Sequence, residues 1–127
     1  MIEKYRSIPY VKGGRDLAGL DCWGLVRLVR SEIKGDLLPE FDGVDPLDKK
    51  TLTKSKESCV IDFDLKQVDI KSGAIACGFT GKLCFHVGVV IEVDGRLFIL
   101  ETDEGTGVVL TSPQMFKSRF SKVEYYD

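Results

Sequence analysis

The residue pair Asp94 and Gly95 constrains the fold more than any other feature of this chain. It separates residues 85–93 from residues 96–102, and both stretches are rich in the β-branched and aromatic residues typical of strands. Asp-Gly between two such stretches is the strongest short-range signal for a β-hairpin with a two-residue turn. We therefore predict an antiparallel hairpin in which Val93 lies opposite Arg96.

A two-residue turn also predicts the partners further along the hairpin. Paired positions keep a constant sum of residue numbers, so Gly88 should lie opposite Glu101 and His86 opposite Asp103. Glu101 then becomes a diagonal neighbour of His86 on one face, where its carboxylate could accept a hydrogen bond and fix the imidazole tautomer. That face is predicted to hold His86, Gly88, Val90, Ile99, Glu101 and Asp103, and the opposite face Val87, Val89, Phe98 and Leu100.

Residues 21–35 have the apolar spacing of an amphipathic helix. Asp21 can cap the start of this helix and Gly35 can end it. Cys22 would then lie in the first helical turn, where unpaired backbone N–H groups and the positive end of the helix dipole favour a thiolate. The side chains expected to face away from the core are Arg27, Arg30 and Lys34.

The order of elements indicates an α+β fold, with N-terminal helices packed on an antiparallel sheet. A short helix is predicted between Asp45 and Ser58, with Asp45 as its cap and Pro46 in its first turn. The apolar run 74–79 suits a buried strand, and residues 107–110 and 123–126 can add edge strands. No repeat or linker divides the chain, so we expect residues 1–127 to form a single domain.

Composition excludes several classes of function. A formal net charge of −2, from 18 basic and 20 acidic residues that are well mixed, provides no positive field for nucleic acid or an anionic membrane. His86 is the only histidine, and none of the four cysteines forms a C-x-x-C pair, so neither a multi-imidazole metal site nor a zinc ribbon is expected. The first residues show no apolar run behind a basic start, so we expect no secretion signal.

Each candidate residue also has an ordinary structural interpretation when it is taken singly. Cys22 could be a small buried hydrophobe, His86 a packed strand residue, and Glu101 a solvated carboxylate. The argument for chemistry therefore depends on the motifs that surround these residues.

Two blocks of sequence resemble the NlpC/P60 family of cysteine peptidases. The first is I-P-Y-V-K-G-G at residues 8–14 followed by G-L-D-C-W-G-L-V at residues 19–26, which matches the pattern P-Y-x-x-G-G then G-x-D-C-(S/W)-G-L-V around the nucleophile. The second is S-G-A-I at residues 72–75 and H-V-G-V-V at residues 86–90, which resemble P-G-D-(L/I/V) and H-(V/A)-G-(I/V)-Y. Ala74 stands where the family usually has Asp.

The resemblance implies a papain-like α+β fold with Cys22 as nucleophile and His86 as its base. The third polar residue of the family is most often His and sometimes Asn or Gln. In the predicted register the candidate here is Glu101, although counting from the turn could instead place Ile99 or Leu100 there. Tyr10, Asp21 and Trp23 are expected to bind substrate or support the oxyanion, together with the backbone N–H of Cys22. The resemblance requires no metal or cofactor.

The family's usual substrate is the peptidoglycan stem peptide, cut between γ-D-glutamyl and a diamino acid. D-C-W-G-L-V after P-Y-x-x-G-G-R, together with residues 104–109, most resembles the tail-tip peptidases of phages and phage-like particles. That form implies synthesis in the cytoplasm without a signal peptide, a final place in the virion tail, and other tail proteins as partners. Two alternatives remain: a structural tail protein of the same fold with weak activity, and an intracellular acyltransferase or thioesterase.

Overall fold

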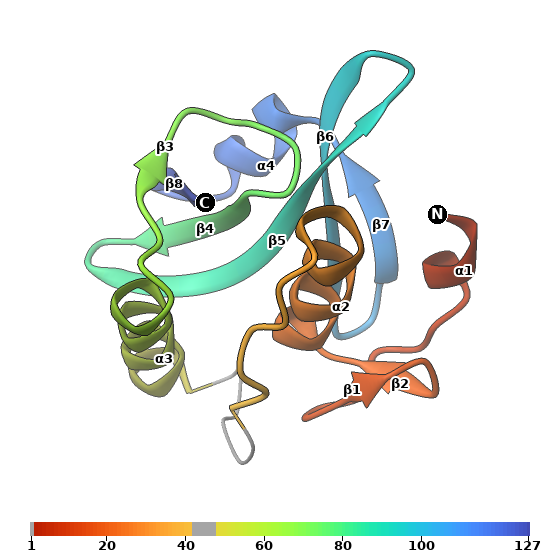
Figure 1. Ribbon diagram of the computed structural model, residues 1–127, viewed down its shortest axis with the longest axis horizontal. Helices are drawn as coiled ribbons and strands as arrows, with labels where there is room; N and C mark the ends of the chain where they lie inside the picture. Colours follow the sequence, from red (N-terminus) through yellow and green to blue (C-terminus); the bar gives the residue numbers. More distant parts are fainter. Residues whose placement is uncertain (1, 42–47) are drawn as a thin grey trace.

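The computed structural model describes residues 2–41 and 48–127, and it contains helices and an antiparallel sheet (Figure 1). The helices are α1 (Glu3–Arg6), α2 (Cys22–Lys34), α3 (Lys49–Asp62) and α4 (Pro113–Ser118). The strands are β1 (Arg15–Asp16), β2 (Gly19–Leu20), β3 (Gln67–Val68), β4 (Ile75–Thr80), β5 (Leu83–Val93), β6 (Arg96–Asp103), β7 (Gly107–Thr111) and β8 (Lys122–Tyr126). The predicted α+β class is confirmed.

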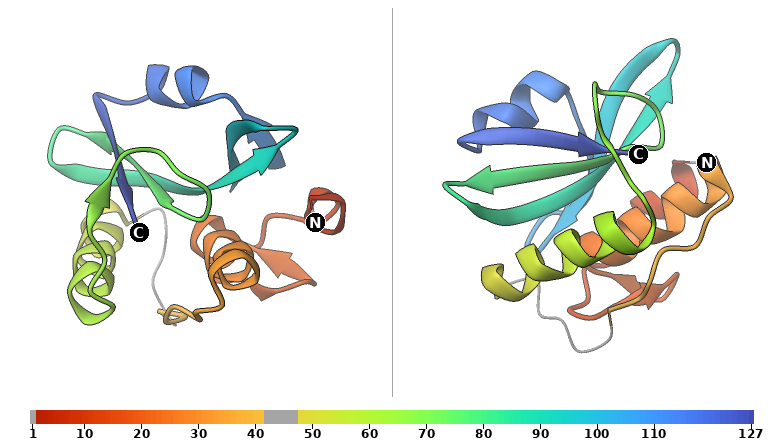
Figure 2. Two further views of the ribbon diagram at one scale, coloured as in Figure 1. Left: turned by 45° about the horizontal axis from the view of Figure 1, so that its top comes forward. Right: turned by 60° about the vertical axis from the view of Figure 1, so that its left-hand side comes forward.

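The main sheet has six strands in the order β3-β8-β4-β5-β6-β7, and each described pairing within it is antiparallel. Helices α2 and α3 cover one face and α4 covers the other, as the left view of Figure 2 shows. The larger apolar cluster fills the space under α2 and α3, and a smaller cluster that includes Phe116 lies under α4. None of the helices in residues 2–41 and 48–127 is long and apolar enough to cross a membrane.

Helix α2 forms where the caps predicted it. The carboxylate of Asp21 accepts a hydrogen bond from the N–H of Gly24, and Gly35 ends the helix in the left-handed conformation. Arg30 corrects the expectation that the basic residues of this helix face solvent. It is buried, because its guanidinium donates to the carbonyl of Gly73 and pairs with Asp127.

Helix α3 begins later than the helix predicted between Asp45 and Ser58. The side chain of Asp48 accepts from the N–H of Thr51 and caps α3, which extends to Asp62 rather than Ser58. Asp45 and Pro46 lie outside the described residues. Strand β7 is an edge strand as predicted, whereas β8 is an inner strand that pairs with both β3 and β4.

The hairpin of β5 and β6 has the predicted register from Val93 opposite Arg96 to Val89 opposite Leu100. The two predicted faces are also confirmed, since Val87 and Val89 join the larger cluster while Val90 joins the smaller. The ladder then stops, and the predicted pairs of Gly88 with Glu101 and His86 with Asp103 are not among the described pairs. Beyond this point β5 continues along β4 and β6 continues along β7, so the two strands diverge.

Candidate active site

Cys22 is the first residue of α2 and lies at the buried end of the helix that faces β5. Its side chain is only 3% exposed. The first N–H groups of a helix have no partner within the helix, so the backbone N–H of Cys22 is available to a developing negative charge. This position places a thiol and an unpaired helical N–H on the same residue, which is a combination suited to acyl transfer.

The loop before α2 is fixed to the helix by the fully buried carboxylate of Asp21. This carboxylate accepts from the N–H of Gly13 at 3.0 Å and from the guanidinium of Arg15 at 2.6 Å, in addition to capping at Gly24. Gly24 also has a steric role, because a Cβ there would lie 2.1 Å from the carbonyl oxygen of Gly14. The glycines and Asp21 of the sequence motif therefore serve to hold the loop close against the start of the helix.

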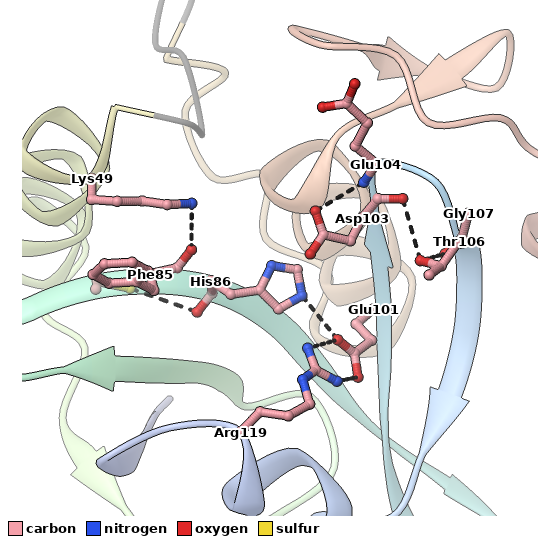
Figure 3. A network of polar contacts seen from close by, with 10 residues as sticks. Lys49, Phe85, His86, Glu101, Asp103, Glu104, Thr106, Gly107 and Arg119 are labelled. Carbon is pink, nitrogen blue, oxygen red and sulfur yellow. Dashed lines mark hydrogen bonds and ion pairs between the residues drawn. The ribbon is translucent and has the colours of Figure 1, made fainter.

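His86 and Glu101 meet where β5 and β6 diverge, and Figure 3 shows their side chains pointing toward each other. The Nε2 atom of His86 lies 2.9 Å from Oε1 of Glu101, and both side chains are buried. An ionised carboxylate can only accept a hydrogen bond, so Nε2 carries a proton and donates a hydrogen bond to Glu101. The remaining ring nitrogen, Nδ1, is left to interact with Cys22.

Electrostatics around the imidazole favour its protonated form. Burial lowers the pKa of His86, but hydrogen bonds with Cys22 and with Glu101 outweigh that effect and raise the pKa to about 9. Burial has the opposite effect on Glu101 and raises its pKa, but hydrogen bonds with His86, Arg119 and Thr111 outweigh burial and lower that pKa to about 2. An ionised Glu101 beside a protonated His86 is the arrangement that stabilises a thiolate on Cys22.

Tyr10 is held close to Cys22 by backbone pairing with the segment that leads into α2. The N–H of Val11 donates to the carbonyl of Leu20 at 3.1 Å, which places Tyr10 next to the residues that lead into α2. Burial raises the pKa of Tyr10 strongly, and the negative charges of Cys22, Asp21, Asp103 and Glu104 add to the effect. The phenol therefore keeps its proton and can donate a hydrogen bond near the sulfur.

Trp23 and Asp21 lie beside Cys22, but their polar atoms are already engaged by the protein. The indole N–H of Trp23 donates to the carbonyl of Pro39 at 2.7 Å, and its ring packs against Phe41. Both residues line a small apolar pocket next to Val87. These contacts hold the helix start in place, and a direct contact of either side chain with substrate stays a prediction.

Sequence reasoning missed the residues that support His86 from the far side of the sheet. Arg119, which follows α4, binds both carboxylate oxygens of Glu101 at 2.7 and 2.8 Å. The ring of Phe120 stacks on the imidazole with an interplanar angle of 18°, and Phe116 lies nearby. Ser112 and Pro113 are a good helix start and could have indicated α4, but no local pattern points from Arg119 to Glu101.

No cluster of three or more His, Cys, Asp or Glu residues suited to a metal ion occurs in residues 2–41 and 48–127. The four cysteines are all buried free thiols.

A solved structure resembles this one over almost its full length. The crystal structure of the NlpC/p60 domain of the peptidoglycan hydrolase SagA superposes with a TM-score of 0.64, covering 98% of this chain and 91% of that chain at 21% sequence identity. The chain has the NlpC/p60 fold. No protein-family model matches the sequence, and a search of curated proteins found no significant match. Within the NlpC/p60 fold, Cys22 starts the helix and His86 lies on the central strand β5.

The imidazole of this NlpC/p60 fold should titrate with a pKa near 9 rather than the ordinary 6.5. Because the chain has one histidine, its ring signals in a proton NMR titration are unambiguous. A pKa raised on folding stabilises the protein fully below 6.5, and this contribution is lost as the pH rises through about 9. The midpoint of thermal unfolding should fall over the same window, and ring signals that titrate near 6.5 would contradict the ion pair.

Proposed function

We propose that this protein is a cysteine peptidase that hydrolyses an amide bond of the peptidoglycan stem peptide, between γ-D-glutamyl and a diamino acid. The observation that carries the proposal is the buried imidazole of His86, which interacts with Cys22 and, through Nε2, with Glu101 at 2.9 Å. The NlpC/p60 fold, found in a peptidoglycan hydrolase domain, supports the choice of substrate.

In the proposed reaction the thiolate of Cys22 attacks the carbonyl carbon of the scissile amide. Negative charge develops on the carbonyl oxygen, and the N–H of Cys22 and the hydroxyl of Tyr10 are the donors placed to stabilise it. The imidazolium of His86 then gives its proton to the leaving amine, which leaves an acyl-enzyme and a neutral imidazole. His86 next takes a proton from water, which attacks the thioester and releases the acid.

The further proposal is that the peptidase belongs to the tail tip of a phage or phage-like particle, in contact with other tail proteins. The support is the form of the motif, D-C-W-G-L-V at residues 21–26 after P-Y-x-x-G-G-R at residues 9–15. In this proposal the protein is made in the cytoplasm and reaches the wall as part of the virion.

One observation weighs against a weakly active structural protein. Glu101 departs from the His, Asn or Gln usual at this position of the family, and this departure favours such a protein. In this fold the carboxylate is fully engaged with His86 and Arg119 and can orient the imidazole at least as firmly as an amide would.

The decisive experiment is incubation of the purified protein with bacterial cell-wall fragments, followed by mass spectrometry. Cleavage should release fragments with a new free carboxyl group on D-glutamate and a new free amine on the diamino acid. Cys22→Ser protein serves as the control and should leave the fragments intact. Absence of new termini from walls of several stem-peptide compositions would overturn the proposed substrate.

A further inference from the structure

We propose that Arg119 is a positioning residue that fixes the carboxylate of Glu101 so that Oε1 accepts the hydrogen bond from Nε2 of His86. The inference rests on the proposed function, because it concerns the same Cys22 and His86. It assigns a role to a residue outside the recognised sequence motifs.

The contacts of Glu101 carry the inference. The guanidinium of Arg119 donates from Nη1 to Oε2 at 2.8 Å and from Nη2 to Oε1 at 2.7 Å. This two-bond pairing sets the plane of the carboxylate as well as its distance, which a single bond would not do. Oε1 is the oxygen that also accepts from His86, so the orientation set by Arg119 passes directly to the imidazole.

Burial makes this orientation matter. Glu101 is 2% exposed, whereas the side chain of Arg119 is 42% exposed. The long side chain of Arg119 therefore reaches from the surface to a buried carboxylate, and its positive charge offsets the cost of burying the negative charge of Glu101. The charged and titratable groups around Glu101 are His86 from β5, Arg119 after α4, Cys22 beyond the imidazole, and Asp103, which acts on Arg119.

The end of α4 is itself fixed against the imidazole. The guanidinium of Arg119 lies 5.3 Å from the ring centroids of both Phe116 and Phe120. Both rings lie beside His86, and the ring of Phe120 packs directly against Gly78 of β4, where an added Cβ would lie 2.5 Å from it. Arg119 therefore approaches Glu101 from a packed aromatic support.

The test compares Arg119→Gln, Arg119→Lys and wild type for hydrolysis of wall fragments. We expect Arg119→Gln to lower kcat about tenfold with little change in KM, because ground-state binding is untouched. Arg119→Lys keeps the charge and one bond and should lose less. Lys117→Gln, which removes an exposed positive charge from the last turn of α4, should behave as wild type.

The pH profile separates positioning from a merely structural role. Arg119 helps to lower the pKa of Glu101, so its removal should raise that pKa. Since the ionised carboxylate is the active form, the acid limb of activity should move to higher pH in Arg119→Gln. The effect should also disappear in a Glu101→Gln background, because the residue would act only through Glu101.

Alkylation of Cys22 by iodoacetamide, followed by mass spectrometry, gives a readout that needs no wall substrate. We expect Arg119→Gln to slow this alkylation, and we expect the same change to have no effect in a Glu101→Gln background. This result would support the positioning role even if the wall fragments stay uncut. Equal alkylation rates and an unmoved acid limb would overturn it, as would the same loss of activity in both backgrounds.

Discussion

Replacing Cys22 by serine should remove hydrolysis of wall fragments by a factor of about 10⁴ or more while the fold remains intact. Serine is close in size to cysteine, but its hydroxyl is a far weaker acid than a thiol, so His86 cannot hold it as a resting anion in the way proposed for the thiolate. The measurement is the rate at which new termini form, together with the thermal unfolding of the variant. Wild-type activity in this variant would contradict the assignment of the nucleophile.

Cys59→Ala is the matched control for this prediction. Cys59 lies on the buried face of α3, and burial raises the pKa of its thiol to about 11, so it remains an inert thiol. Its removal should cost about 1 kcal/mol of stability without loss of activity at a temperature where the variant is folded.

Glu101→Leu should reduce hydrolysis about 10³-fold, and Glu101→Gln only about tenfold. Leucine leaves the buried Nε2 proton of His86 without an acceptor and removes the partner of Arg119, so the imidazole loses both its orientation and its counter-charge. The amide oxygen of glutamine can still accept from His86 and loses mainly the charge.

The comparison is made from initial rates, with thermal unfolding measured for each variant, because leucine is also expected to destabilise the fold by several kcal/mol. Glu92→Gln, at an exposed position of the same hairpin, is the control for loss of a carboxylate. Glutamine and leucine variants with equal rates near that of wild type would show that Glu101 does not orient His86.

The features that could be predicted from sequence are those set by nearby residues. The ends of α2 at Asp21 and Gly35 were predictable, because capping residues act within one turn of the helix. The Asp94 and Gly95 turn fixes the register for several residues, which was enough to choose Glu101 over Leu100 as the partner of His86.

The features that could not be predicted depend on contacts between distant parts of the chain. The end of the ladder at Val89 and Leu100 results from the competing pairings of β5 with β4 and β6 with β7. Arg119 reaches Glu101 only because the chain crosses the sheet after β7, forms α4, and returns as β8 between β3 and β4. Neither the crossing nor the inner position of β8 has a local sequence signal.

Strands β5 and β6 separate beyond Val89 and Leu100, and the imidazole of His86 lies where they separate. Helix α2, which begins at Cys22, covers one face of the sheet, and α4 covers the other (Figure 2). Arg119 follows α4 and binds Glu101. Substitutions at the end of α4 can therefore tune the acidity of the imidazole without adding an atom on the side of the nucleophile. Reactivity and substrate fit are then adjustable through separate surfaces of one small protein.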